Sequence, residues 1–336
     1  MQSLLDPAVL FFVFGVFAGL VRSNLEMPPA ISKFLSLYLL MALGLKGGFA
    51  LSQSGLTPSV ATGLGLAVLL AVVVPLLGYA VLRRRLSGFD ATAIAATYGS
   101  VSAVTFVTAV QHLETHQIPF GGHMAAAMAL MESPAIVLAV LMANALRQQA
   151  ASQPALPVGG AAVLAAGPPG GVPHLGKVLH ESLTDGAQLL LLGAMLVGML
   201  SGDAGREAMQ PFSGDLFKGM LAFFLLDMGL MTARNLPQLR GQSPWLVAYA
   251  VLGPITHAAL AMGLARLCGV ALGDAILLTV LAASASYIAV PAVVRHAIPE
   301  ANPSLYFSLS LGVTFPLNIL FGIGLYSQVA QRVWGA

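Results

Sequence analysis

One pattern of polar residues occurs twice in this chain. Asp90, Ser100, Ser102 and His112 recur, with the same spacing, as Asp274, Ser284, Ser286 and His296. Each copy lies in a long apolar stretch, with its Ser-x-Ser step about halfway along. Serine and glycine weaken a helix at such a place, and serine hydroxyls can satisfy the backbone groups that a break leaves free. Two apolar helices interrupted by small polar residues are typical of secondary transporters, which bind their solute at the breaks.

The half-helix that begins at each break indicates the type of solute. Its first N–H groups are unpaired, and its N-terminus carries the positive end of the helix dipole. If the two halves of the chain insert in opposite orientations, these positive ends face each other across four serine hydroxyls. Such a site binds a small anion without a lysine or arginine. The predicted substrate-binding residues are Gly99, Ser100, Val101, Ser102, Ser284, Ala285, Ser286 and Tyr287.

The other polar residues of the pattern have simpler explanations. Small residues such as those of the Ser-x-Ser motif also allow a neighbouring helix to pack closely. Helix packing is therefore the alternative to a substrate-binding site. Repetition at matched depth favours the site. We expect Asp90 and Asp274 to be helix N-caps at the membrane surface. His112 and His296 fall at the far ends of these helices, where histidine can pair with terminal carbonyls.

Charged residues inside apolar spans are costly and therefore indicate function. Glu132 lies in the middle of a span, and Pro134 frees a backbone carbonyl beside it. A carboxylate beside a free carbonyl suits a hard cation such as sodium, or a proton. The predicted cation-binding residues are Glu132, Ser133, Thr314 and Asn318, with sodium as the coupling ion and no other cofactor. Lys46 and Asp227 are expected either to form a buried ion pair or to act in transport.

Composition predicts an all-α polytopic membrane protein. Of 336 residues, 57% are hydrophobic and 8% are charged, and the mean hydropathy is +0.86. A soluble domain does not have this balance. The formal net charge of +2 is too small to indicate a nucleic-acid partner. From this composition we expect the lipid bilayer to surround the chain.

Apolar runs predict ten spans in two halves. We place them at about 5–21, 34–53, 57–82, 90–112, 119–146, 180–200, 211–232, 244–268, 274–296 and 303–331. Residues 1–146 form a first five-helix repeat, and residues 179–336 form a second. Residues 147–178, rich in proline, glycine and alanine, form a flexible linker. Because five is an odd number, the second repeat enters the membrane inverted, with broken helices at the fourth and ninth spans.

The distribution of lysine and arginine predicts the orientation. With the N-terminus outside, ten basic residues fall on the cytoplasmic side and five on the outer side. The cytoplasmic group includes the consecutive Arg83, Arg84 and Arg85. This balance favours both termini outside and a cytoplasmic linker, in the inner (plasma) membrane.

The same residues resemble the sodium-dependent bicarbonate transporter family first associated with cyanobacteria. The resemblance covers nearly the whole chain outside the linker. It rests on the stretches 29–32, 44–48, 99–102, 131–135, 282–286 and, most specifically, 295–306. It implies a ten-helix carrier of the elevator type that imports bicarbonate with sodium. It also implies a homotrimer and a PII-like cytoplasmic regulator.

The chain departs from the family pattern at several positions, including Ala289-Val290-Pro291 where the family tends to have Ser-Gly-Pro. Tyr287 stands where the family carries an aspartate after the second serine motif, which removes one plausible cation ligand. Glu132 replaces an aspartate in Met-Asp-x-Pro, which keeps the charge and changes its reach. These departures leave open a carrier of another small anion, coupled to protons or uncoupled.

Two further hypotheses are alternatives to a small-anion carrier. A carrier of the bile-acid or auxin type would have a larger, wetter cavity than a centre lined by serine and alanine. An intramembrane enzyme would need a nucleophile and base or metal ligands, and neither His-Glu-x-x-His nor Gly-x-Ser-x-Gly occurs in the sequence. We therefore predict a transporter and no enzyme activity.

Overall fold

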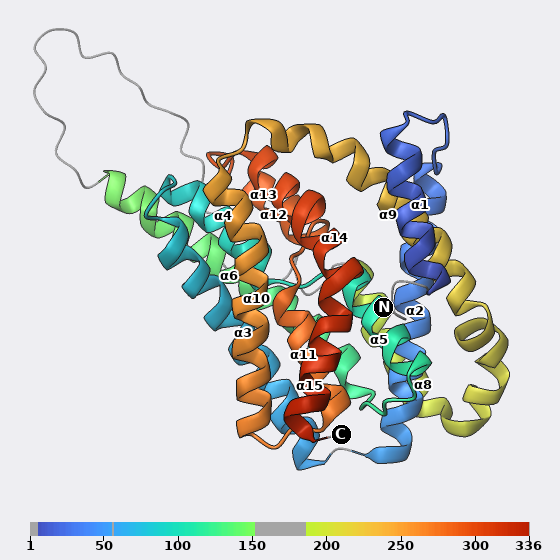
Figure 1. The fold of residues 1–336 in the computed structure, drawn as a ribbon. Coiled ribbons are helices and arrows are strands. Elements are labelled where there is room, and N and C mark those ends of the chain that lie inside the picture. The colour runs from blue at the N-terminus through green and yellow to red at the C-terminus, as the bar shows by residue number, and fades with distance from the viewer. Residues whose placement is uncertain (1–5, 56, 152–185, 336) are drawn as a thin grey trace, which may run out of the picture.

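A computed structural model describes residues 6–55, 57–151 and 186–335 of the chain, and these ranges fold into helices (Figure 1). Several helices begin with proline, whose fixed φ suits the first helical position. At the first of them, the Asp6 carboxylate also accepts from the Ala8 N–H at 2.9 Å. The helices before residue 152 are α1 (Pro7–Leu20), α2 (Pro29–Ser54), α3 (Pro58–Leu82), α4 (Gly88–Gly99), α5 (Ala103–Thr115) and α6 (His123–Ala151).

The helices after residue 185 are less regular. A residue with positive φ, Gly202, kinks α8, and π-helical turns flank Pro316 in the last segment. The elements are α8 (Gly186–Gln210), η2 (Pro211–Asp215), α9 (Phe217–Asn235), η3 (Leu236–Gly241), α10 (Pro244–Leu267), α11 (Leu272–Ala283), α12 (Ala289–Ala297), α13 (Pro303–Leu309), η4 (Ser310–Thr314), α14 (Phe315–Leu317), η5 (Asn318–Gly322) and α15 (Ile323–Trp334).

Seven helical segments among the described residues are long and apolar enough to cross a membrane. The predicted boundaries differ from the observed ones at several helices. Helix α2 begins at Pro29 rather than 34, and α6 runs from His123 to Ala151. Its last five residues therefore belong to a helix rather than to the predicted linker, because Arg, Gln and Ala favour helix. Residues 152–178 of that linker and 180–185 of the sixth span lie outside the described residues.

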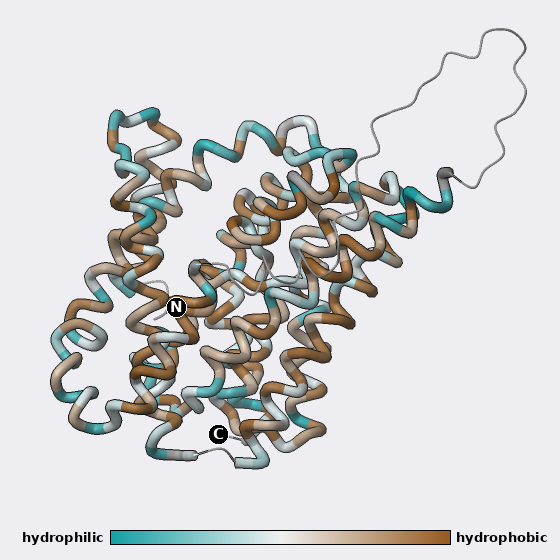
Figure 2. Tube along the Cα trace, turned by 180° about the vertical axis from the view of Figure 1, so that it is seen from behind, coloured by the Kyte–Doolittle hydropathy of each residue, from teal (hydrophilic) through white to brown (hydrophobic). Residues whose placement is uncertain are grey.

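The surface has the character of a membrane protein. Large apolar side chains are exposed, with Leu200 at 81% and Leu267 at 85%. Contiguous apolar surface of this kind needs lipid or a partner to cover it. Figure 2 shows the hydrophilic residues gathered mainly at the turns at two ends, with hydrophobic helices between them. The fold is therefore that of a multi-pass membrane protein, as composition predicts.

Four helices form two closely packed pairs, α1 with α9 and α2 with α8. Glycine permits the close approach in each pair. A side chain at Gly229 would collide with the carbonyl oxygen of Phe12, and one at Gly48 with that of Met195. The remaining helices pack mainly among themselves, α3 with α4 and α6, and α10 with α11. The helices thus separate into two groups.

The predicted capping role of Asp90 and Asp274 is wrong. Ser87 caps α4 by accepting from the Asp90 N–H at 3.1 Å, and Ser87 in turn donates to the Asp90 carboxylate at 2.7 Å. The reason is that Asp90 occupies the third helical position, where its own N–H is one of those that an N-cap side chain satisfies. Asp274 also lies at the third position of its helix.

Each aspartate instead holds a backbone amide of the opposite half of the chain. The Asp90 Oδ1 accepts from the Asn302 N–H at 2.8 Å, just before α13. The Asp274 Oδ1 accepts from the Gly121 N–H at 2.6 Å, just before α6. The two contacts join the fourth and last helical segments of the two halves in a reciprocal manner.

A further contact joins the end of α6 to the turn before α13, and it leads to a testable prediction. Arg147 donates from Nε and Nη2 to both carboxylate oxygens of Glu300, each at 2.8 Å. These hydrogen bonds hold the pKa of Glu300 below its usual value. The pair therefore stabilises the fold above the unfolded pKa of about 4.3, and that contribution is lost as pH falls through the lower folded pKa.

We expect Glu300→Gln to lower the melting temperature of the purified protein slightly at neutral pH, since exposed pairs contribute about 1 kcal/mol or less. The difference from wild type will stay constant above about pH 5 and shrink below the unfolded pKa of about 4.3. Melting curves measured over this pH range test it. A difference that grows toward acid pH would contradict the assignment.

Candidate functional site

The first predicted break is present between α4 and α5. Helix α4 ends at Gly99, Ser100 has extended backbone angles, and α5 begins at Ala103. The Ser102 side chain caps the new helix, because its Oγ accepts from the Thr105 N–H at 3.2 Å. Pro75 of α3 packs where a side chain on Gly99 would lie. Glycine and serine thus permit both the end of one half-helix and the start of the next.

The second break is similar but two residues longer, and the N-cap of its second helix is Ile288. Helix α11 ends at Ala283, Ser284 is extended, and α12 begins at Ala289. The Ser286 Oγ accepts from the Val290 N–H at 3.3 Å, which again places a serine at the start of a half-helix. Figure 1 shows that α4 and α12 lie toward one end of the molecule, and α5 and α11 toward the other. The prediction that both segments are interrupted at their serines is confirmed.

The two breaks cross and contact each other. The Ser102 N–H donates to the Ser284 Oγ at 2.9 Å, and the Ser286 N–H donates to the Thr97 carbonyl at 2.8 Å. Ser100, Ser102, Ser284 and Ser286 are all at most 3% exposed. The serine motifs, far apart in the sequence, therefore form one buried polar cluster. The starts of α5 and α12 belong to it.

A small cavity of about 80 Å³ lies at the starts of α5 and α12. Predicted substrate residues line it from both breaks, together with the predicted cation residue Glu132 of α6. The remaining walls come from α2 and α8, so the cavity lies between the two helix groups. The lining includes Ser36, Val101, Ser102, Glu132, Gln188, Ser286 and Tyr287.

The other predicted substrate residues lie at the two breaks but do not line this cavity. Gly99 packs on Pro75, and Ala285 is buried in the hydrophobic core. Ser284 bonds to Ser102 and to the Leu281 carbonyl. Ser100 is buried, and its Oγ has no hydrogen-bond partner among the described residues. None of these four residues is among those that line the cavity.

The predicted cation residues are divided between two places. Glu132 lines the cavity, and Ser133 follows it on α6. Thr314 instead donates to the Ala250 carbonyl at 2.7 Å and lies 2.7 Å from the Tyr98 Oη. Asn318 donates to the Ala283 carbonyl at 2.8 Å. Thr314 and Asn318 therefore brace the helix ends beside the breaks, and the structure does not bring them to the cavity.

Sequence reasoning missed two polar residues of the site, Ser36 and Gln188. The Gln188 Nε2 donates to the Glu132 Oε2 at 2.7 Å, and both side chains line the cavity. Gln188 is 6% exposed. Its signal in the sequence is a single amide at the start of an apolar run that follows the glycine-rich segment. Such a residue needs a buried partner, and here that partner is the carboxylate.

The predicted pairing of Lys46 with Asp227 is wrong. Lys46 of α2 bonds to both carboxylate oxygens of Glu114 on α5, at 2.9 and 3.2 Å, and its Nζ lies 4.1 Å from the centre of the Phe217 ring. Asp227 is buried in α9, and its Oδ2 has no hydrogen-bond partner among the described residues. The sequence placed Glu114 beyond the end of its span, whereas α5 carries it to Lys46.

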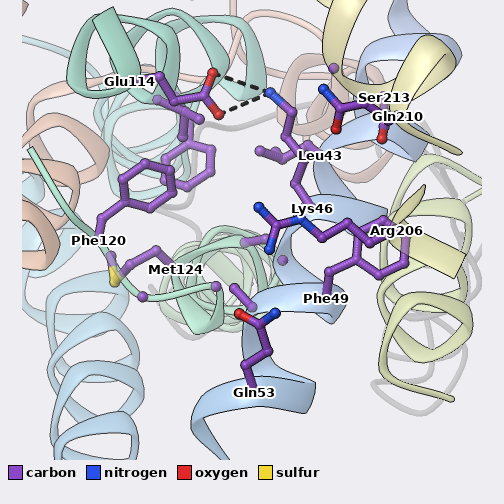
Figure 3. Close-up of a pocket in the computed structure, with 18 of the residues that line it drawn as sticks. Leu43, Lys46, Phe49, Gln53, Glu114, Phe120, Met124, Arg206, Gln210 and Ser213 are labelled. Atoms are coloured by element: carbon purple, nitrogen blue, oxygen red, sulfur yellow. Dashed lines mark hydrogen bonds and ion pairs between the residues drawn. The ribbon is translucent and has the colours of Figure 1, made fainter. Parts of the chain in front are cut away.

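The Lys46–Glu114 pair lies in a larger cavity of about 760 Å³ (Figure 3). The cavity contains several polar and charged side chains: Gln53, Glu114, Arg206, Gln210, Ser213, Asp215 and Lys218. Helices α2, α5 and α6 line both cavities, at neighbouring turns. Leu43, Phe106 and Met124 line the large cavity, and Leu40, Val104 and Met128 line the small one. The two cavities therefore follow one another along the same interface.

Comparison with known families agrees with this geometry. Residues 7–331 match the family described as the Na+-dependent bicarbonate transporter superfamily. A comparison with curated proteins finds no match. The matched range includes both interrupted helices, Glu132 and the Lys46–Glu114 pair. Because it covers nearly the whole sequence, the chain belongs to the Na+-dependent bicarbonate transporter superfamily.

Proposed function

We propose that this protein is a secondary transporter that imports bicarbonate, or a similarly small anion, together with sodium. The observation that carries the proposal is the cavity of about 80 Å³ at the starts of α5 and α12. Pockets for drug-sized ligands usually measure about 300–1,000 Å³. The cavity is thus too small for a bile acid or another large organic anion. Its size supports an anion of a few atoms.

The two helix starts supply the attraction for that anion. Backbone N–H groups in the first turn of α5 and α12 have no helical partner, and two positive helix ends meet at one place. The hydroxyls of Ser102 and Ser286 accept from these first turns and hold them in position. No lysine or arginine lines the cavity in the described part of the chain. A weakly held small anion can leave such a site again, as transport requires.

Glu132 explains how a cation would be coupled to the anion. It is the one charged residue among the described residues that line the cavity. A carboxylate and an anion repel each other in a small buried space, and a sodium ion between them turns that repulsion into attraction. Sodium binding then raises anion affinity, and anion binding raises sodium affinity by the same factor. Tyr287 occupies the position of the family aspartate, so this coupling depends on Glu132.

The helix arrangement supports ten crossings in two inverted repeats. The longest candidate segment, Gly186–Leu239, is kinked at Gly202 and has the length of two crossings. The short helix α1 and the interrupted pair α11–α12 add two more to the seven candidates. The packing of α1 on α9 mirrors that of α2 on α8, as a two-fold relation between repeats requires. The reciprocal contacts of Asp90 and Asp274 have the same symmetry.

The same arrangement supports an elevator mechanism. The group α1, α2, α8 and α9 would form a scaffold, and the other helices would carry the breaks past it. Both cavities lie where these groups meet. A homotrimer and a PII-like regulator, which family membership suggests, belong to this proposal. An orientation in the plasma membrane with the termini outside also belongs to it. The turn after α1 holds Arg22, the turn after α3 holds Arg83–Arg85, and η3 holds Arg240. These three elements lie at one end of the molecule (Figure 1), which would be the cytoplasmic end.

One alternative has a specific observation in its favour. With Tyr287 in place of an aspartate, a single carboxylate lines the cavity, and a single carboxylate can carry a proton instead of sodium. Coupling to protons, or the absence of coupling, would leave the anion site unchanged. The same experiment separates these possibilities.

The deciding experiment is uptake of labelled bicarbonate into proteoliposomes. We expect an inward sodium gradient to drive uptake and an equal potassium gradient not to. A proton gradient without sodium tests the alternative, and excess nitrate, formate or sulfate tests anion selectivity. An absence of bicarbonate uptake under every gradient would reject the proposal.

The large cavity leads to a prediction about steering. It contains Lys46, Arg206 and Lys218 against Glu114 and Asp215, so positive charge is in excess. An excess of positive charge in this cavity raises the local concentration of an anion. We expect Arg206→Gln to raise the KM for bicarbonate roughly two- to fivefold at low ionic strength, with little change in maximal rate. Near 1 M inert salt, where the screening length is about 3 Å, the difference should disappear. A difference that persists at high salt would contradict steering.

A further inference from the structure

The outer surface of the molecule contains an apolar groove between α3 and α10, which lie side by side in Figure 1. The groove has a volume of about 580 Å³, and Leu77, Val81 and Leu252 belong to its walls. On α10 it extends from Trp245 to Leu260, about 22 Å along the helix axis at 1.5 Å per residue. This length is close to that of a single extended lipid acyl chain.

One end of the groove is strongly basic. Arg84 lines it there, between Arg83 and Arg85, directly after the end of α3. The Arg83 guanidinium lies 5.5 Å from the centre of the Tyr79 ring, which holds it near the helix. No acidic residue lines the groove in the described part of the chain. The charge at this end is complementary to an anionic headgroup.

Aromatic residues mark the depth at which that headgroup would lie. Trp245, the second residue of α10, occupies the same end as Arg84, and tryptophan favours the membrane–water interface. Tyr249 lies one turn deeper, about 6 Å along the axis. The centre of its ring lies 6.2 Å from that of Trp245, in a stacked arrangement, and 5.3 Å from that of Tyr98.

Tyr249 also has an unused hydrogen-bonding group. It is 8% exposed, and its Oη is buried with no hydrogen-bond partner among the described residues. A buried hydroxyl without a partner is costly and normally has one. Because this Oη lies inward beside Gly78 of α3, the Tyr249 ring, and not its hydroxyl, forms the wall of the groove.

We propose that this groove is a binding site for one anionic phospholipid. An acyl chain lies along α10 against the Tyr249 ring, and the phosphate contacts Arg84. The site does not depend on the transported solute. Basic residues close to a membrane surface attract anionic lipids in general, and the groove adds a fixed position for one of them.

Native mass spectrometry of the purified protein, with phosphatidylglycerol or phosphatidylcholine of equal chain length as the probe, tests this site. Ala248→Phe fills the groove from an exposed position on α10. Ala259→Phe is the matched control, since Ala259 is exposed on the same helix and does not line the groove. For the headgroup, Arg84→Gln is compared with Arg266→Gln near the opposite end of α10.

We expect wild-type protein to retain phosphatidylglycerol in preference to phosphatidylcholine. Ala248→Phe should lower that retention at least about fivefold and Ala259→Phe should not, and Arg84→Gln alone should abolish the headgroup preference. Equal retention by the two phenylalanine variants overturns the proposal, as does an equal preference in the two arginine variants. A change of oligomeric mass in Ala248→Phe, with lipid retention unchanged, would assign the groove to a second copy of the chain and also overturn it.

Discussion

Ser102→Leu and Ser286→Leu will each reduce bicarbonate uptake to background, at least about a hundredfold below wild type. A leucine at either position occupies a cavity of only about 80 Å³ and leaves no space for the solute. Each 1.4 kcal/mol of lost affinity corresponds to about a tenfold change in binding, so a hundredfold loss corresponds to about 2.8 kcal/mol. Initial rates of labelled uptake in proteoliposomes measure the effect.

The loss should not arise from unfolding. Removing the Ser102 cap of α5 costs about 1 kcal/mol and overpacking costs about 1–3 kcal/mol, which together stay below a typical stability of about 5–15 kcal/mol. Size-exclusion profiles of both variants should therefore match wild type. Ser52→Leu, at an exposed position on α2 outside both cavities, is the matched control and should transport normally. Normal uptake kinetics in Ser102→Leu or Ser286→Leu would show that the anion site lies elsewhere.

The interrupted helices were predictable because their cause is local. Gly99, Ser100 and Ser102 are poor helix formers in the middle of an apolar run, and the second copy of the motif repeats this feature. The contact between Ser102 and Ser284 follows from the crossing of the two breaks, which repetition at matched depth already indicated. Here the sequence contained both the conformation and the partner.

Partners of charged residues were less predictable, because apolar periodicity does not determine which helix faces meet. Lys46 pairs with Glu114, although Glu114 lies beyond the predicted end of its span and Asp227 lies in the span that corresponds to that of Lys46 in the repeat. Gln188 bonds to Glu132 across the two helix groups, and no pattern in the sequence links them. The capping of α4 by Ser87 was hidden because the more polar Asp90 stands three residues later.

The division of the predicted cation residues has the same origin. Thr314 and Asn318 flank Pro316, and a proline in an apolar helix indicates free carbonyls without indicating where neighbouring side chains point. In the structure both side chains bond to backbone carbonyls of α10 and α11. Glu132 alone of the four predicted cation residues lines the cavity together with serines of both breaks. Coupling should therefore be sensitive to this one carboxylate.

Glu132→Gln will weaken sodium dependence more than it weakens uptake itself. The amide keeps nearly the same shape, and its oxygen can still accept the hydrogen bond that Gln188 donates to the carboxylate at 2.7 Å. It removes the charge that would hold sodium next to the anion. Two unit charges about 4 Å apart interact by about 4 kcal/mol at an effective dielectric constant of 20. We therefore expect the sodium concentration for half-maximal uptake to rise at least about tenfold, measured by sodium titration at constant ionic strength.

Glu207→Gln is the matched control, since Glu207 is exposed on α8 and lines neither the small cavity nor the large one. Its sodium titration should coincide with that of wild type. If coupling is instead to protons, Glu132→Gln will abolish the response to a pH gradient, and sodium will have no effect on the wild-type protein. An unchanged sodium titration in Glu132→Gln, in a wild type that does depend on sodium, would move the cation away from the anion cavity. The thermodynamic coupling between the two solutes would then need a path through the helices rather than a shared site.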